Sequence, residues 1–131
     1  MRRFVLAAVL CLFLSPGARA DVRIEQMHVA LRDGQVNVRV TVFNPGSTRQ
    51  PGPVLIDLYI RRDESEQWTR VRTWDDIRMI QPGYRVSRDF FGENNAYLAE
   101  LAAEGHFEAR AVVRVPGGVK DVERIEAYER E

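Results

Sequence analysis

The chain contains the segment Val36-Asn37-Val38-Arg39-Val40-Thr41-Val42-Phe43, in which a valine occupies every second position. An apolar period of two is typical of a β-strand with one face in the core, so we expect the four valines to be buried. The dipeptide Asp33-Gly34 just before it favours a tight hairpin turn. The partner strand is then Val22–Leu31. Its apolar residues change from even to odd positions along the strand, and this change predicts a bulge near Gln26–His28.

The same period recurs along the rest of the chain, interrupted by turns rich in Gly, Pro, Asn and Asp. The further predicted strands are Val54–Ile60, Trp68–Trp74, Tyr84–Phe90, Phe107–Val115 and Val119–Tyr128. We expect loops at Asn44–Pro53 and Pro116–Gly118, and an irregular lead-in at Asp75–Ile80. The last strand is dense in charge, which suits the edge of a sheet.

One segment has helical rather than strand spacing. Ala96–Glu104 places its apolar residues on one face, after an Asn cap and before Gly105. Seven short strands separated by turns, in one domain of about 110 residues, are typical of an immunoglobulin-like antiparallel β-sandwich. Because the Cys…Trp…Cys pattern of antibody domains is missing, a fibronectin-III-like variant fits better.

The first twenty residues have the pattern of a secretory signal peptide. Met1-Arg2-Arg3 is basic, Phe4–Leu14 is apolar, and Ala18-Arg19-Ala20 is a small-x-small cleavage site. The apolar run is too short to span a bilayer comfortably. We therefore divide the chain into a signal peptide, residues 1–20, and a mature domain, residues 21–131, that is exported and either periplasmic or secreted.

Charge and cysteine content exclude several classes of function. All 19 acidic residues but only 16 of the 19 basic residues follow the cut, so the mature formal charge is −3. Mixed charges with this balance argue against nucleic-acid binding. The one cysteine, Cys11, lies in the signal peptide, so the mature domain has no disulfide and no thiol ligand. The polar C-terminus predicts no membrane insertion after cleavage.

Several segments resemble one known family. Four segments look like parts of the bacterial cell-adhesion-related (CARDB-like) immunoglobulin-like domains. They are the strand and turn at Val38–Ser47, the strand Val54–Ile60, the Pro-Gly turn at Ile80–Tyr84 and the segment Gly105–Val113. The resemblance implies the sandwich fold. It also implies an exported binding or structural module, which in that family usually belongs to a longer protein.

The most suggestive candidate site is Trp68-Thr69-Arg70-Val71-Arg72-Thr73-Trp74. In a regular strand, Trp68, Arg70, Arg72 and Trp74 share one face. Two indoles beside two guanidinium groups suit contact with a protein or stacking on sugar rings. The alternative is structural, with one or both Trp covering the core and the Arg stems along the surface.

Other candidate sites are weaker. His28, with Met27 and Met79, suggests a copper site, but no set of converging ligands is visible. The acidic turn Asp63–Glu66 and the pair Asp75-Asp76 suggest calcium, although short acidic turns are usually only solvated. No serine lies in a nucleophile-elbow context. We therefore predict no catalytic, metal or cofactor residues and no enzymatic activity.

These observations favour an exported, non-catalytic binding or accessory module that acts on an envelope protein or a carbohydrate. The alternatives are a periplasmic inhibitor or chaperone-like protein and, third, a small enzyme. Inhibition would use loops at one end of the sandwich, Asn44–Pro53 and Pro116–Gly118. A chaperone-like role would use an open sheet edge.

Signal-peptide cleavage can be tested directly. We expect the exported protein to begin at Asp21, because signal peptidase needs small residues at positions 18 and 20 of this sequence. Mass spectrometry of the envelope fraction should show this terminus. An intact Met1 or a lipid on Cys11 would contradict the prediction.

Overall fold

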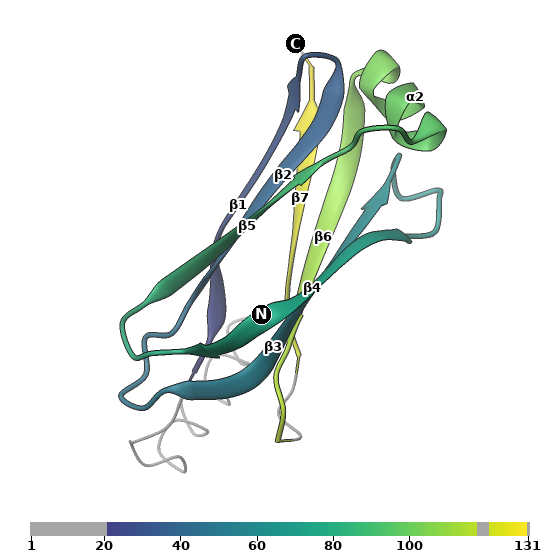
Figure 1. Ribbon diagram of the computed structural model, residues 1–131. Coiled ribbons are helices and arrows are strands. Elements are labelled where there is room, and N and C mark those ends of the chain that lie inside the picture. Colours follow the sequence, from purple (N-terminus) through teal and green to yellow (C-terminus); the bar gives the residue numbers. More distant parts are fainter. Residues whose placement is uncertain (1–20, 118–120, 131) are drawn as a thin grey trace, which may run out of the picture.

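The computed structural model describes residues 21–117 and 121–130. The predicted signal peptide and the predicted turn and strand start at Gly118, Val119 and Lys120 lie outside these residues. Within the described residues the chain forms seven strands and one helix (Figure 1). In chain order they are β1 (Arg23–Arg32), β2 (Gln35–Phe43), β3 (Gln50–Arg61), β4 (Thr69–Ile80), β5 (Arg85–Phe91), α2 (Ala96–Glu104), β6 (His106–Arg114) and β7 (Val122–Glu129).

The strands form two antiparallel sheets packed face to face. A three-stranded sheet has the order β1-β2-β5, and a four-stranded sheet has the order β4-β3-β6-β7. Figure 1 shows the two layers, with α2 at the end of the sandwich where β6 begins. In a constant-type immunoglobulin domain the fourth strand joins the sheet of the first two, whereas here β4 pairs with β3. The predicted immunoglobulin-like sandwich is confirmed.

The β1–β2 hairpin follows the sequence prediction closely. Asp33 and Gly34 have φ angles of 51° and 73°, the positive values that a tight two-residue hairpin turn requires. The register shifts between Ile24 and Gln26, so the predicted bulge is present, just before the predicted range. It changes which residues face inward, and Ile24 and Met27 are both buried.

Alternate residues of the central strands fill the core. The four valines of β2 are fully buried, as predicted, and so are the inward residues of β3. The fully buried inward positions are Val36, Val38, Val40 and Val42 in β2, Val54, Ile56, Leu58 and Ile60 in β3, and Ala109 and Ala111 in β6. Because each fully buried branched side chain contributes about 1.5–3 kcal/mol, these rows dominate the stability of the domain.

Two predicted irregular segments are strand instead. β3 begins at Gln50, which pairs with Ile80, and β4 runs on through residues 75–80. Register shifts on both sides of Val54 allow this, because bulges accommodate prolines that cannot donate to the ladder. Gly52 lies at this irregularity, where a Cβ would sit 2.0 Å from the Arg78 carbonyl oxygen. A glycine is therefore needed for β3 and β4 to approach.

The helix α2 has the predicted bounds and caps. The Asn95 side chain accepts a hydrogen bond from the Leu98 N–H at 3.0 Å. Gly105 adopts φ 87° and donates its N–H to the Leu101 carbonyl at 2.9 Å. Leu98, Leu101 and Ala102 are buried, so the helix closes one end of the core beside β2 and β6.

Asn44 joins the two sheets at the other end. Its side chain is fully buried, and Nδ2 donates to the carbonyls of Ile80 at 2.9 Å and Thr48 at 3.0 Å. Oδ1 accepts from the Gly46 N–H at 2.9 Å, and the Asn44 backbone N–H donates to the Tyr84 carbonyl at 3.1 Å. Because Asn44 follows β2 and Ile80 ends β4, these bonds fix one sheet against the other.

We expect Asn44→Ala to destabilise the domain strongly. Each buried polar group left without a partner costs about 1–3 kcal/mol, so the free energy of unfolding should fall by at least about 2 kcal/mol. Urea unfolding followed by circular dichroism measures this, with Ser47→Ala, an exposed position in the same loop, as the control. Equal midpoints for the two variants would contradict the role of Asn44.

Candidate functional site

The four residues of the candidate face, Trp68, Arg70, Arg72 and Trp74, do not share one face of a strand. Arg72 lies opposite Leu58 and Arg70 lies opposite Tyr59, with a register shift between the two pairs. Leu58 is in the core and Tyr59 faces outward, so the two arginines lie on different sides of β4. The extra residue, Val71, makes a bulge that exchanges the faces. Their part in partner binding stays a prediction.

The two tryptophans are separated in the same way. Trp74 lies opposite Ile56 and is 5% exposed, so it belongs to the core, and the Arg72 guanidinium lies 5.5 Å from its ring centre. Trp68 precedes β4 and is half-buried, with the Arg61 guanidinium 4.1 Å from its ring centre. The structural alternative therefore holds for Trp74, while Trp68 and Arg70 remain on the outer side.

The outer face of the four-stranded sheet brings Arg70 together with residues from the three other strands. Arg70, Tyr59, Arg110 and Ile125 follow one another across β4, β3, β6 and β7, and we call them the Tyr59 row. The Arg110 guanidinium lies 5.3 Å from the centre of the Tyr59 ring. Ile125 is 49% exposed, although it lies in a sheet. The Tyr59 row with Trp68 and Arg61 forms what we call the outer patch.

Most arginines of this outer face already have a carboxylate partner. The pairs are Arg61–Glu108 at 2.7 Å, Arg110–Glu123 at 2.7 Å and Arg114–Asp57 at 2.8 Å. Arg70 is exposed and forms no ion pair with another side chain of residues 21–117 and 121–130. Its guanidinium therefore keeps its five N–H donors for solvent or for a partner.

Asp57 lies beneath the outer patch as a buried carboxylate. It is 2% exposed, and it accepts hydrogen bonds from the Thr73 hydroxyl at 2.6 Å and from the Arg114 guanidinium at 2.8 Å. Burial opposes ionisation, but these two hydrogen bonds, together with the positive charges of Arg114 and Arg70, outweigh it, so the pKa of Asp57 lies below its ordinary value of 3.8. Asp57 thus ties β4 and β6 to β3 beneath the outer face.

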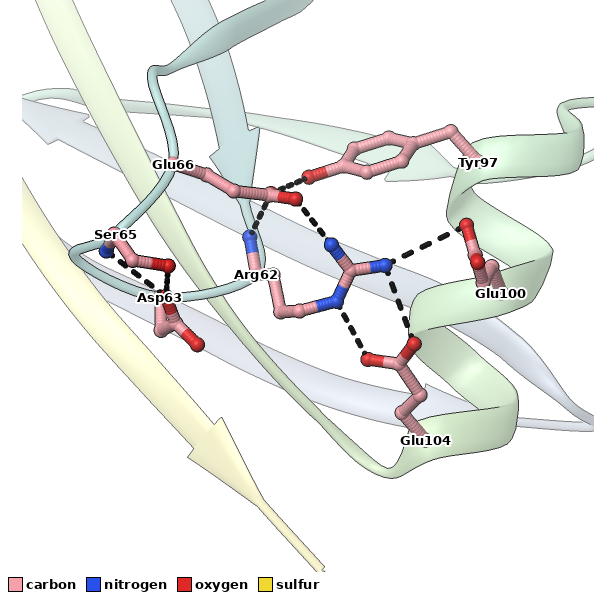
Figure 2. A network of polar contacts seen from close by, with 7 residues as sticks. All are labelled: Arg62, Asp63, Ser65, Glu66, Tyr97, Glu100 and Glu104. Atoms are coloured by element: carbon pink, nitrogen blue, oxygen red, sulfur yellow. Dashed lines mark hydrogen bonds and ion pairs between the residues drawn. The ribbon is translucent and has the colours of Figure 1, made fainter.

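A second polar cluster joins the β3–β4 turn to α2 (Figure 2). The Arg62 guanidinium contacts Glu66, Glu104 at 2.7 Å and Glu100 at 3.5 Å. The Tyr97 hydroxyl donates to Glu66 at 2.5 Å, and burial together with this carboxylate raises the pKa of Tyr97 to about 12. The hydrogen bonds to Arg62 and Tyr97 lower the pKa values of Glu104 and Glu66. Since its groups are mutually satisfied, this network anchors the turn that carries Trp68.

The structure brings together no metal-binding set in the part of the chain that it describes. Within residues 21–117 and 121–130, no group of three or more His, Cys, Asp or Glu side chains is placed to hold a metal ion. His28 lies on β1 and His106 on β6, in different sheets. The Asp63 carboxylate accepts from the N–H of Ser65 at 2.9 Å and from its hydroxyl at 2.5 Å, within its own turn.

Sequence patterns did not identify four members of the outer patch, which are Tyr59, Arg61, Arg110 and Ile125. Arg110 lies in a strand that is recognisable from the sequence by its apolar face. Alternation along β6 was enough to place Arg110 outward. No local pattern, however, shows that β3 pairs with both β4 and β6, and only that pairing places Arg110 beside Tyr59.

Comparison with known proteins identifies the fold. Neither a protein-family model nor a curated protein sequence matches the chain. Among solved structures, the CARDB domain of a Pyrococcus furiosus protein, in complex with di-metal ions, matches with a TM-score of 0.54 and 13% identity, covering 85% of this chain and 94% of that one. The chain has a CARDB-like immunoglobulin-type fold. The resemblance found in the sequence is confirmed at the level of the fold.

A second similar structure is the archaellum periplasmic stator protein FlaG from Sulfolobus acidocaldarius. FlaG matches the present chain with a TM-score of 0.50 and 12% identity, covering 82% of this chain and all of FlaG. At sequence identities this low, the two structural matches show a common fold and nothing more. Among the described residues, no helix is both long and apolar enough to cross a membrane.

The buried carboxylate under the outer patch makes a testable contribution to stability. Because the pKa of folded Asp57 lies below 3.8, its stabilisation is complete above the unfolded value and is lost as the pH falls below it. We expect Asp57→Asn to lower the free energy of unfolding near neutrality, and the gap to the wild type to narrow between about pH 7 and about pH 3.

Urea titrations at both pH values measure this gap. Asp75→Asn, at an exposed position of the same sheet, is the control and should follow the wild type throughout. A gap between Asp57→Asn and the wild type that stays constant with pH would contradict the ionised Asp57–Arg114 pair.

Proposed function

We propose that this chain is an exported, non-catalytic accessory module that binds an acidic protein partner in the cell envelope. The contact surface is the outer patch on the four-stranded sheet. The observation that carries the proposal is the Tyr59 row, in which an exposed Arg70, with no ion pair to a side chain of the described residues, lies beside an aromatic ring and a second guanidinium. The signal peptide predicted from the sequence supports a location in the cell envelope or outside the cell.

The composition of the outer patch supports binding to a protein. Tyr, Trp and Arg are the residues that most often carry binding energy at protein interfaces. Tyr59 and Trp68 are each covered on one side by a guanidinium, so both rings are already held in place before binding. A partner meeting such pre-ordered side chains loses less conformational entropy on binding.

The charges of the outer patch indicate the chemistry of the partner. Arg61 and Arg110 are neutralised by Glu108 and Glu123, which leaves the guanidinium of Arg70 as the exposed positive centre of the row. A guanidinium binds a carboxylate through two parallel hydrogen bonds. An acidic side chain of the partner, set beside an apolar group that covers Ile125, fits this arrangement.

The fold comparison supports a non-catalytic role. FlaG, which has the same fold, is an archaellum periplasmic stator protein. An accessory role outside the cytoplasm is therefore one that this fold can serve, and the ion-paired arginines of the outer face suit such a role.

The separation of the two arginines provides a matched test. Arg70→Ala should lose the partner in an affinity capture from the native envelope, because anchor residues of this type contribute about 2 kcal/mol, or roughly 30-fold in affinity. Arg72→Ala removes a guanidinium that is also exposed but lies on the other side of β4, and this variant should still capture the partner. Quantitative mass spectrometry of the captured proteins gives the comparison.

Two further results decide the proposal. The charge reversal Arg70→Glu should abolish capture, and the partner lost with it should have an acidic binding surface. Capture that survives Arg70→Glu, or that is lost only with Arg72→Ala, would contradict the outer patch as the contact surface.

A further inference from the structure

A hollow of about 230 Å³ lies on the opposite side of the molecule, on the outer face of the three-stranded sheet. This is the layer of β1, β2 and β5 in Figure 1. The side chains that matter here are His28 and Arg32 on β1, Asn37 and Arg39 on β2, and Asp89 and Phe91 on β5. We call it the Asn37 hollow. The core of the sandwich lies between the Asn37 hollow and the outer patch.

The hollow results from one small residue in a row of large ones. Ala30, Asn37 and Phe91 lie opposite one another across the three strands. Along β1, Ala30 stands between His28 and Arg32 on the same face. Because a methyl group replaces a long side chain at this point, the space above Asn37 stays open.

Asn37 forms the floor of the hollow with an unused amide. Its side chain lines the hollow, and the residue is only 8% exposed. The side-chain amide of Asn37 makes no hydrogen bond to residues 21–117 and 121–130. Within these residues, every side-chain nitrogen or oxygen that is sealed from solvent has a hydrogen-bond partner, so the Asn37 amide must be open to solvent. The amide is therefore reached from the hollow alone. Because the amide opens into the hollow and makes no hydrogen bond to the described residues, its donors and its acceptor are available to a ligand.

The walls offer a complementary set of contacts. Phe91 is 53% exposed and presents an apolar ring at one side. Arg39 binds Asp89 through two hydrogen bonds, at 2.7 and 3.2 Å, which fixes both planar groups beside the floor. Arg32 is exposed and adds a second guanidinium, so the hollow has two arginines against one carboxylate.

We propose that the Asn37 hollow binds a carboxylate-bearing sugar unit of a glycan, of the uronic acid class. A sugar ring carries hydroxyl groups that both donate to and accept from an amide, and these match the free amide of Asn37. Its C–H face packs on the ring of Phe91, as apolar surfaces do on aromatic side chains. Its carboxylate meets the guanidinium of Arg32, which the single Asp89 does not neutralise.

The test uses the mature domain and two soluble oligosaccharides of equal length. Tetragalacturonate carries the carboxylates, and cellotetraose is neutral. In a ¹H–¹⁵N NMR titration we expect saturable shifts from tetragalacturonate at the backbone amides of Asn37, Arg39 and Phe91. The neutral sugar should bind roughly tenfold more weakly, since it lacks the charge-assisted contact.

A matched pair of variants separates binding from stability. Asn37→Leu keeps the volume but removes the amide, so affinity for tetragalacturonate should fall roughly tenfold. The melting midpoint should stay equal or rise, because the lost amide makes no hydrogen bond to residues 21–117 and 121–130. Thr41→Val, on the same strand and face, breaks the 2.8 Å contact with the Ser87 hydroxyl and should leave affinity unchanged.

A second pair tests the aromatic wall. Phe91→Ala should also weaken tetragalacturonate binding, while Tyr84→Ala, at a 65% exposed aromatic outside the hollow, should not. The absence of saturable shifts, equal affinity for the neutral sugar, or unchanged affinity of Asn37→Leu would each overturn the proposal. None of these results bears on Arg70 and the protein partner, because the two surfaces lie on different sheets.

Discussion

Alternate side chains of β2, β3 and β6 are buried between the two sheets. This alternation determines which side chains of these strands lie on the outer faces. The inward positions from Val36 to Val42 and from Val54 to Ile60 have no exposed area. A shift by one residue would move each apolar row into solvent, so the register of these strands is strongly constrained. The intervening residues, Tyr59, Arg110 and Asn37 among them, are thereby held at fixed spacing on the outer faces of the two sheets.

Polar contacts at the two ends make the sandwich a rigid support. Asn44 bonds to the last carbonyl of β4 at one end, and the Arg62 network holds the β3–β4 turn against α2 at the other. Between them, Asp57 joins three adjacent strands of one sheet. The two outer faces then differ in kind. The outer face of the four-stranded sheet presents guanidinium groups and aromatic rings for a broad contact, and that of the three-stranded sheet holds a small polar hollow.

Much of this architecture could be predicted from local patterns. The alternating valines, the Asp33-Gly34 turn and the capped helix Ala96–Glu104 each follow from the preferences of a few neighbouring residues, and the structure confirms them. The candidate site could be predicted only in part, because the bulge at Val71 moves Arg70 and Arg72 to different sides of β4. Bulges and sheet order depend on pairing with distant strands, which a single sequence does not record.

We expect the outer patch, rather than a loop or the opposite sheet, to contact a protein partner in the envelope. Site-specific photo-crosslinking in living cells can detect this contact, with a photoreactive residue at position 70, at position 125 or at position 84. We expect one common protein adduct from positions 70 and 125 and none from position 84, because Tyr84 is exposed on the β4–β5 turn, away from the outer patch. Adducts from position 84 alone, or no protein adduct from positions 70 and 125, would contradict it.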